Sequence, residues 1–347
     1  MLDNGNTDWT AKILVITNNP DRASFRQRIE IYLDNLRNQG INCTVCCYPK
    51  GPLTRWRLLK SSRNFDAVLL HKKRLGAFGA SCLRHSARKI IYDFDDAVMF
   101  SDKKPDRPSQ KRLRDFKRTA KLADLIIAGN VYLAEHAQKF NDNVKILATG
   151  LNIGEYDVKI NRPNDGKIRL VWIGSKATLP YMNEIKPALE EIGSRLKNVV
   201  LRIISDEFIE LQNMKVEKCD WSQQTQARDL AECDIGLAPL SDNPFARGKC
   251  GFKILQYAAA GLPSIASPVG VNAQIVRNGV NGYHAVAVGD WIEKISALVN
   301  NKPFRKEMGL AARQMVRPFD LDVIGRQLVA LVKETIQNQS AIDGENI

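Results

Sequence analysis

Residues 168–205, IRLVWIGSKATLPYMNEIKPALEEIGSRLKNVVLRIIS, decide the fold because they contain one complete strand–helix–strand unit. The apolar runs IRLVWIGS (168–175) and VVLRIIS (199–205) predict buried strands, and the segment 180–197 between them has helical periodicity. Strands joined by a helical crossover lie parallel, and their near-continuous apolar character indicates that helices cover both faces of the sheet. The stretch therefore predicts an α/β protein.

The same alternation runs through the rest of the chain. In the first half it predicts a helix over 24–40 and strands at 11–17, 41–48, 66–71, 89–94, 124–129 and 144–149. In the second half it predicts strands at 234–240, 263–268 and 282–287, a helix that begins in RGKCGFKILQYAAAG (247–261), and closing helices over 290–301, 303–316 and 320–338. The repeat favours two doubly wound, Rossmann-like domains.

A polar interval, GLNIGEYDVKINRPNDGK (150–167), interrupts this pattern near the middle of the 347 residues, a length that itself favours two domains. We therefore expect a first domain over 1–150, a linker over 151–167 and a second domain over 168–320. The last segment, 321–347, is expected to be a helix that packs back toward the first domain, with a frayed tail after about residue 339. Carboxyl ends of the strands in two such domains would face one central cleft.

Composition excludes several classes of protein. No apolar run reaches the roughly 18 residues of a membrane span, and acidic residues precede the first apolar run, unlike a signal peptide. Seven scattered cysteines and four histidines make a zinc site improbable and favour free thiols in a reducing cytoplasm.

The positive charge is concentrated in the first half. Residues 1–150 carry 27 Lys and Arg against 15 Asp and Glu, and residues 50–89 carry eleven basic side chains against one acidic one. The stretch PLTRWRLLKSSRNF (52–65) mixes these cations with Trp and Leu, which suits an anionic membrane face. A nucleic-acid partner would also explain the positive charge, but the region contains no recognisable nucleic-acid module. The third interpretation of the basic region is a solvated surface that binds no anionic partner.

Three cations surround glycines at the start of a predicted helix in RGKCGFK (247–253): Arg247, Lys249 and Lys253. A helix N-terminus already offers unpaired N–H groups and a partial positive charge, so the added cations predict a bound anion. The alternative is a basic helix start paired with Asp242 or another neighbour.

Several segments together resemble glycosyltransferase family 4, the retaining enzymes of GT-B fold. The resemblance lies in DIGLAPLSDNPFARGKCGFKILQYAAAGLPSIASPVGVNAQIVRNGVNGYHA (234–285), IIYDFDDAVMF (90–100), AGNVYLAEHA (128–137) and VWIGSKATLPYM (171–182), and it covers roughly residues 12–338. It implies a nucleotide-sugar donor, UDP- or GDP-linked, held mainly by the second domain, with no metal and no other cofactor.

This chain departs from the family's Glu-x7-Glu signature, for which it has RGKCGFK-x-LQY. The first glutamate, which usually contacts the transferred sugar, aligns with Gly248, and the second, which usually holds the ribose, aligns with Gln256. Gln256 keeps a neutral hydrogen-bond acceptor there. The family's arginine after Gly174 is replaced by Ser175, with Lys176 adjacent.

A leaving diphosphate still requires positive charge. We expect Arg247, Lys249 and Lys253 to supply it, together with the N–H groups of Gly251 and Phe252 at the helix start.

The motif DFDD (93–96) has competing interpretations. The alignment places Asp95 and Asp96 at the family's His-Asp position, which makes Asp95 a cleft residue that contacts sugar hydroxyls or the acceptor nucleophile. Asp95 could instead cap the following segment. Asp93 and Asp95 could also bind Mg²⁺ or Mn²⁺ as a DxD motif.

Four further residues are candidates on the same grounds. Ser24 and Arg26 open the first helix, where such enzymes admit the acceptor, and Arg26 is otherwise a surface cation. His71 ends a strand and lines the acceptor side or serves the structure. The resemblance places Trp221, in CDWSQQTQ (219–226), after the third strand of the second domain in the family's base-binding loop, where it either stacks on the base or packs.

The resemblance therefore implies a glycosyltransferase, EC 2.4, of the hexosyltransferase type. It would move a sugar with retention to a glycan or lipid-linked acceptor, in cell-surface polysaccharide or lipopolysaccharide assembly. We expect it to lie in the cytoplasm, peripheral to the inner face of the membrane, with no nucleic-acid partner. Two alternatives stay open: a catalytically degenerate GT-B protein that acts as a binding or scaffold subunit, and a sugar-nucleotide epimerase of the same architecture.

Overall fold

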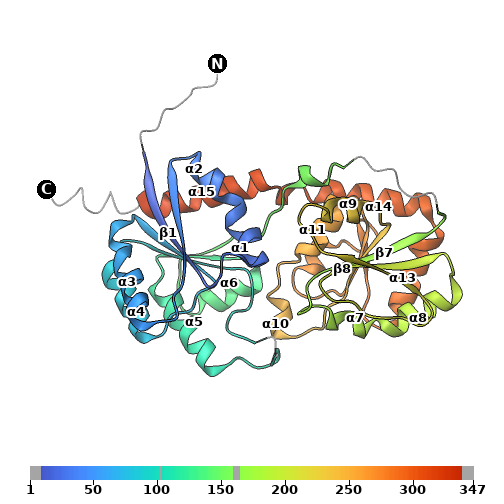
Figure 1. Cartoon of the computed structure of the whole chain (residues 1–347), viewed down its shortest axis with the longest axis horizontal. Helices are drawn as coiled ribbons and strands as arrows, with labels where there is room; N and C mark the ends of the chain where they lie inside the picture. Colours follow the sequence, from blue (N-terminus) through green and yellow to red (C-terminus); the bar gives the residue numbers. More distant parts are fainter. Residues whose placement is uncertain (1–8, 102, 159–164, 338–347) are drawn as a thin grey trace, which may run out of the picture. The chain divides into compact units, whose positions relative to one another are not determined.

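The computed structural model describes residues 9–101, 103–158 and 165–337 (Figure 1). The chain divides into two compact units. The first unit comprises the chain up to Gly150, the short segment Gly248–Cys250 and the chain from Leu321 onward, and the second comprises Leu151–Arg247 and Gly251–Asp320. The expected fraying after about residue 339 lies outside the described residues.

The first unit contains a parallel six-stranded sheet in the order β2-β1-β3-β4-β5-β6. Its strands are β1 (Ala11–Thr17), β2 (Ile41–Cys47), β3 (Ala67–His71), β4 (Ile90–Phe94), β5 (Leu125–Ala128) and β6 (Val144–Ile146). Its helices are α1 (Ala23–Arg28), α2 (Leu33–Arg37), α3 (Pro52–Ser61), α4 (Ala77–Ser86), α5 (Gln110–Leu122), α6 (Val131–Gln138) and α15 (Leu321–Gln337), with 3-10 turns η1 (Glu30–Tyr32) and η2 (Ser62–Asn64). The strand order reverses between β1 and β3, the position where doubly wound sheets bind ligands.

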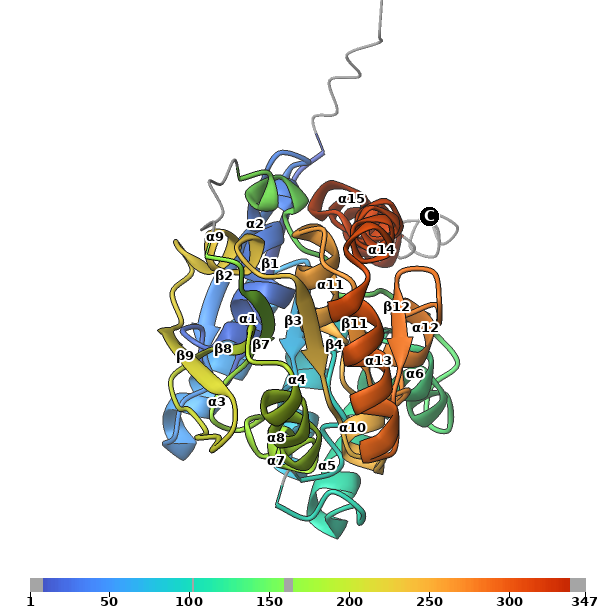
Figure 2. The ribbon, with the colours of Figure 1, turned by 90° about the vertical axis from the view of Figure 1, so that its right-hand side faces the viewer.

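The second unit repeats this architecture with the strand order β12-β11-β10-β7-β8-β9, again parallel (Figure 2). Its strands are β7 (Ile168–Ile173), β8 (Val199–Ser205), β9 (Lys215–Asp220), β10 (Ile235–Ala238), β11 (Ser264–Ala266) and β12 (Gly282–His284). Its helices are α7 (Pro180–Glu184), α8 (Lys186–Arg195), α9 (Gln226–Ala231), α10 (Pro244–Arg247), α11 (Phe252–Ala259), α12 (Asn272–Ile275), α13 (Val288–Asn300) and α14 (Lys302–Met315), with 3-10 turns η3 (Ile153–Tyr156) and η4 (Arg317–Phe319). The strand order reverses between β7 and β10.

Strand β7 shows why the apolar runs predicted this fold. Leu170 and Trp172 lie in the hydrophobic core on one face of the sheet, whereas Val171 and Ile173 lie in the core on the other face. A strand that is covered on both sides is apolar at nearly every position. The α/β class with two Rossmann-like units, predicted from this pattern, is confirmed by the two sheets.

Two predicted helices are broken in the structure. The segment 24–40 forms α1, η1 and α2, and the segment 180–197 forms α7 and α8. Pro187 lies in the first turn of α8, where its missing N–H is tolerated; within one continuous helix it would remove a hydrogen bond and clash with the preceding turn. The second break therefore has a local steric cause.

Two segments at the boundaries of the units contribute buried side chains. Leu151 and Tyr156, in the interval expected to be a linker, are buried in the core of the second unit. Helix α15 buries Ile324, Leu328 and Val332 in the core of the first unit. Within the described part of the chain, no helix is long and apolar enough to cross a membrane.

Candidate active site

The carboxyl ends of β1 and β3 meet at the switch point of the first unit and bring Thr17 and His71 together. The Thr17 Oγ1 and the His71 Nδ1 are 3.1 Å apart. His71 is buried at 2% exposure, and its Nε2 has no hydrogen-bond partner in the structure. Burial is the main cause that lowers the pKa of His71 to about 3, so the ring is neutral near pH 7. His71, a predicted acceptor-side residue, thus lies at the edge where ligands bind.

A buried ion pair lies beside this histidine. The guanidinium of Arg28 donates to both carboxylate oxygens of Asp93, from Nη2 at 2.8 Å and from Nε at 3.1 Å, and Nη1 donates to the Leu147 carbonyl at 2.7 Å. Burial raises the pKa of Asp93 and Arg28 opposes that rise. Because Arg28 keeps its proton and donates several bonds to this carboxylate, the pair is ionised.

Two more carboxylates follow β4 and share one cation. The Nζ of Lys72 lies 2.8 Å from Asp95 Oδ1, an ion pair, and donates a hydrogen bond to Asp96 Oδ2. Burial by itself would raise the pKa of Asp95, but the charges of Lys72 and Arg28 outweigh it and hold that pKa well below its usual range. Asp95, predicted as a catalytic residue, is therefore a buried carboxylate already paired with Lys72.

Lys72 reaches these carboxylates from an unusual backbone conformation. Its φ of 55° is left-handed, and among the described residues no other non-glycine residue has a positive φ. That conformation costs an L-residue about 1–2 kcal/mol. Its N–H donates to the Asp93 carbonyl at 2.7 Å, which extends the pairing of β3 with β4 by one residue.

The other acceptor-side candidates have different surroundings. Ser24 is half-buried in the first turn of α1, and Arg26 donates from Nη1 to the Asp21 carbonyl at 2.5 Å. The sequence reasoning chose Arg26 and missed Arg28, although a signal was present. Phe25, Arg28 and Ile29 recur at helical spacing on the buried face of the segment, and a charge on such a face needs a buried partner.

In the second unit, the loop after β7 begins with Gly174. A Cβ at this position would lie 2.6 Å from the Trp172 ring and 2.8 Å from Thr178 Oγ1, so packing alone requires glycine. Ser175 is exposed and closes the following turn through its carbonyl, which accepts from Thr178 N at 2.9 Å. Lys176 is directed at Glu207, with which it forms an exposed ion pair.

The start of α11 has the geometry of an anion site. Gly251 caps the helix with a left-handed φ of 67°, and its carbonyl accepts from Ile254 N at 2.9 Å. The amides of Phe252 and Lys253 therefore precede the helical hydrogen bonds. The Lys253 ammonium lies 4.5 Å from the centroid of the Trp172 ring, a cation–π distance.

The two remaining cations of this stretch have different environments. Arg247 ends α10 and forms a two-pronged pair with Asp242, Nε to Oδ1 at 2.6 Å and Nη2 to Oδ2 at 3.0 Å, with both side chains about half exposed. The segment Gly248–Cys250 groups with the first unit, where the Asn130 amide donates to the Gly248 and Lys249 carbonyls at 3.2 Å each. Lys249 itself is half-buried.

Gln256 lies at the centre of a chain of amide hydrogen bonds. Its Nε2 donates to the Tyr156 hydroxyl at 3.1 Å and to Gln226 Oε1 at 3.0 Å, and that same oxygen accepts from the Trp221 indole N–H at 3.2 Å. An indole N–H can only donate, so it fixes Gln226 Oε1 as an acceptor and Gln256 Nε2 as a donor. Both protons of the Gln256 amide are then committed, and its Oε1 remains as the acceptor of a residue that is 4% exposed.

Trp221 combines this anchor with an exposed ring: its side chain is held by Gln226 while the residue remains 37% exposed. Gln226 and Tyr156 were missed by sequence reasoning. No local signal marks them, because they reach Gln256 across 30 and 100 residues of chain.

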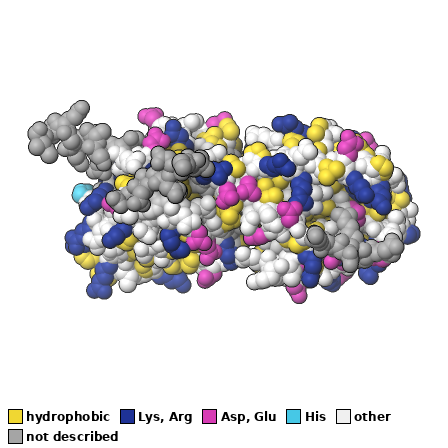
Figure 3. Space-filling view, turned by 90° about the horizontal axis from the view of Figure 1, so that it is seen from above, with side chains coloured by type: hydrophobic (Ala, Val, Ile, Leu, Met, Phe, Trp, Pro, Cys, Tyr) yellow, Lys and Arg dark blue, Asp and Glu magenta, His cyan; other side chains and the backbone are white. Residues whose placement is uncertain are grey.

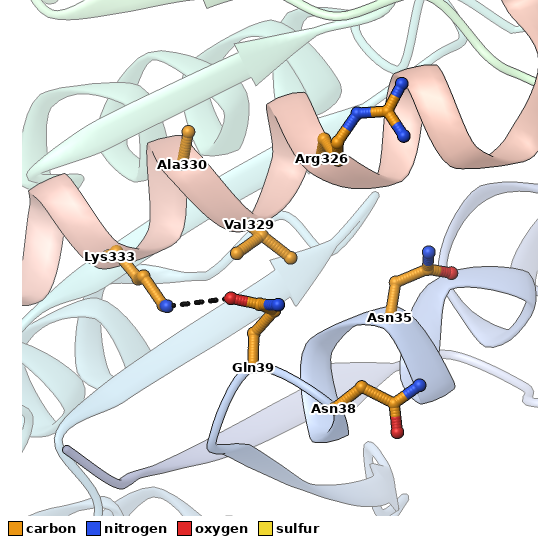
Figure 4. Close-up of a pocket in the computed structure, with 7 residues that line it drawn as sticks. All are labelled: Asn35, Asn38, Gln39, Arg326, Val329, Ala330 and Lys333. Atoms are coloured by element: carbon orange, nitrogen blue, oxygen red, sulfur yellow. Dashed lines mark hydrogen bonds between the residues drawn. The ribbon is translucent and has the colours of Figure 1, made fainter. Parts of the chain in front are cut away.

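The described residues include no cluster of three or more His, Cys, Asp or Glu side chains arranged to hold a metal ion. A groove of about 480 Å³ does exist in the first unit, between α2 and α15, where Lys333 donates to Gln39 (Figure 4). Its residues include Asn38 and Gln39, just before β2 begins, so it lies toward the amino edge of the sheet. None of the predicted site residues lines it.

Comparisons with known proteins agree with this architecture. Residues 160–301 match the family model described as glycosyl transferases group 1. Of the solved structures, HepE of Anabaena in complex with UDP and glucose aligns with a TM-score of 0.71 at 16% identity, over 93% of this chain and 100% of that chain. No curated protein sequence matches significantly.

Two further structures give the same result. Sucrose-phosphate synthase of Thermosynechococcus elongatus has a TM-score of 0.70 at 13% identity, over 93% of this chain and 98% of its own. A glycosyltransferase of Rickettsia africae has a TM-score of 0.71 at 15% identity, over 95% and 99%. The protein has the GT-B fold of these structures, and the match to the glycosyl transferase model covers 142 of its 347 residues.

Proposed function

We propose that this protein is a retaining, metal-independent glycosyltransferase of family 4 that moves a sugar from a UDP- or GDP-sugar to a glycan or lipid-linked acceptor. The observation that carries the proposal is the Gln256 network in helix α11 of the second unit. The network commits both amide protons of the buried Gln256 and leaves its Oε1 as an acceptor at the position where the family has a glutamate, and it includes the indole N–H of the exposed Trp221.

The proposed reaction divides the work among these groups. Gln256 Oε1 accepts a hydrogen bond from the ribose, and Trp221 stacks on the base. The amides of Phe252 and Lys253, with the Lys253 and Lys249 ammonium groups, stabilise the negative charge that develops on the leaving diphosphate. A phosphate oxygen then takes the proton of the acceptor hydroxyl on the same face of the sugar, which gives retention.

Donor binding and turnover test the proposal together. We expect a UDP- or GDP-sugar to raise the melting temperature and to be hydrolysed slowly without an acceptor, with no loss of rate in EDTA. Lys249→Ala should lower turnover by about 100-fold while the fold survives, because removal of one group that stabilises developing charge has an effect of this size. Lys215→Ala, an exposed lysine on β9, is the matched control. Near-normal turnover of Lys249→Ala would remove this lysine from the mechanism.

A second candidate is favoured by two ion pairs. Arg247 is engaged by Asp242 and Lys176 by Glu207, so two of the predicted phosphate ligands have carboxylate partners. This suits a degenerate GT-B protein that binds a nucleotide or a glycan without turning it over. The absence of hydrolysis with every nucleotide sugar, with or without a melting shift, would favour that function.

We also propose a membrane-bound working position in polysaccharide or lipopolysaccharide assembly, at the cytoplasmic face. Helix α3 exposes Leu53 (71%) and Trp56 (38%) among its cations, and Lys60 lies 4.6 Å from the Trp56 ring centroid. The left-hand end of Figure 3, in the first unit, shows Lys and Arg side chains next to hydrophobic ones. Apolar side chains between cations suit an anionic lipid surface.

Vesicle flotation tests this position. Phosphatidylglycerol vesicles should bind the protein and phosphatidylcholine vesicles should not, and Arg57→Ala should weaken binding about fivefold, since each cation near such a surface contributes about 1 kcal/mol. Leu53→Ser should weaken binding further. Leu310→Ser, on the exposed face of α14, is the control and should bind as the unaltered protein does. Equal binding to both lipids would exclude the electrostatic part.

A further inference from the structure

Lys72 is unusual in both its backbone conformation and its burial. It follows β3 directly at the switch point of the first sheet, and its left-handed backbone is held by the bond from its N–H to the Asp93 carbonyl. This conformation directs the side chain onto the end of β4, where it is only 14% exposed. Strain of this kind persists where the surroundings impose it, and it is concentrated at functional sites.

The charges around Lys72 do not cancel. The facing groups are Arg28 from α1, His71 from β3, Asp93 from β4, and Asp95 and Asp96 from the turn after β4. Arg28 is committed to Asp93, and His71 is neutral, so Lys72 alone faces two carboxylates. The charges of Arg28, Lys72, Asp93, Asp95 and Asp96 therefore sum to one net negative charge.

The surplus charge is presented at Asp96. The Asp95 side chain is 7% exposed, whereas that of Asp96 is 36% exposed. Lys72 binds Asp96 through Oδ2, so this bond does not occupy Oδ1, and the Asp96 side chain is partly exposed. A partly exposed carboxylate that is held by a lysine accepts hydrogen bonds from hydroxyl groups and repels phosphate.

We propose that Lys72 is a positioning residue that holds the Asp96 carboxylate to accept a hydrogen bond from a sugar hydroxyl of the acceptor. The inference rests on the proposed glycosyltransferase function. It moves the substrate contact from Asp95, whose charge serves the cluster, to Asp96. The neighbouring Lys73 has a different task, since its Nζ bonds Asn18 Oδ1 at 3.1 Å and lies 3.8 Å from the Tyr48 ring centroid.

A set of substitutions at position 72 separates charge from backbone strain. Lys72→Gly removes the cation and accepts the left-handed φ without cost, Lys72→Met removes the cation but keeps the stem, and Lys72→Arg keeps the charge. Lys73→Met is the matched control. The readout is the carboxyl ¹³C resonance of Asp96 in the full-length protein saturated with UDP, titrated with methyl glucoside as a neutral sugar probe.

We expect the probe to shift the Asp96 resonance in the unaltered protein, in Lys73→Met and in Lys72→Arg. The dissociation constant should be about tenfold weaker in both Lys72→Gly and Lys72→Met, since an aligned hydrogen bond to a charged group is lost. An Asp96 resonance that does not respond, or responds equally in Lys72→Met, would overturn the inference. The melting shifts with UDP and with GDP test the proposed function separately. The absence of both shifts refutes donor binding, whereas nucleotide binding without a sugar response refutes only the role of Lys72.

Discussion

At the carboxyl edge of its sheet the first unit buries full charges, whereas at the corresponding edge the second unit buries Gln256 in a network of neutral groups and leaves its ion pairs exposed. In the first unit, Arg28 and Lys72 are arranged against three carboxylates, and the strength of these charges at low dielectric fixes their positions. In the second unit, a single indole N–H sets the orientation of two successive amides. The comparison shows that buried ion pairs fix where the side chains of the first unit lie, whereas the indole donor of Trp221 fixes which way the amides of Gln226 and Gln256 are turned.

The largest expected effect comes from breaking the charged edge. Arg28→Met should lower the free energy of unfolding by about 3–5 kcal/mol, because Asp93 would be left as an uncompensated buried charge. Urea unfolding of the full chain measures it. The double change Arg28→Met with Asp93→Leu should recover much of the loss, and Arg26→Met should cost little. A small loss for Arg28→Met would show that the charged edge is no more rigid than the amide edge.

A smaller effect is expected where charge is introduced into the amide edge. Gln256→Glu restores the residue of the family signature, but its new oxygen would face Gln226 Oε1, which the Trp221 N–H holds as an acceptor. Two facing acceptors lose a buried hydrogen bond, so we expect a destabilisation of about 1–3 kcal/mol and weaker UDP binding. Thermal unfolding and UDP titration measure both effects. Gln224→Glu, an exposed neighbour, should behave as the unaltered protein, and tighter UDP binding by Gln256→Glu would contradict the deduced orientation.

The smallest effect is a pH dependence of the charged edge. The unfolded chain protonates His71 below a pKa of about 6.5, whereas the folded protein keeps it neutral down to about pH 3. Protons therefore favour the unfolded state, and stability should fall by about 1 kcal/mol between pH 7 and pH 5.5. His71→Asn should remove this slope and His85→Asn should retain it, as followed by urea unfolding at each pH. An unchanged slope in His71→Asn would place the titration elsewhere.

The strands were predictable to the extent that both of their faces are buried. Strands such as β7 and β8 are apolar at nearly every position, so composition alone identifies them. Strand β9, KVEKCD, is a charged edge strand, and the sequence pattern provides no bounds for it. The breaks within the predicted helices 24–40 and 180–197 were not predicted either, because the helical period of apolar residues continues across a break in the backbone.

The candidate site divides in the same way. His71 and Gly251 were predicted from their places at a strand end and at a helix start, which follow from chain order, whereas Asp95 and Gln256 were predicted from the resemblance to the family's motifs. Arg28 and Gln226 were not, because their partners are distant in sequence.

The sequence by itself determined the two α/β halves, the glycine at the start of α11 and the types of polar residue at each sheet edge, because these depend on local periodicity and backbone geometry. Only the tertiary structure decided which cation meets which carboxylate. In the structure Arg28 pairs with Asp93, and Lys72 pairs with Asp95 and Asp96. The hydrogen bond between Gln226 and Gln256 fixes the orientation of the Gln256 amide. Those choices depend on distances across the sheet, and no short-range pattern records them.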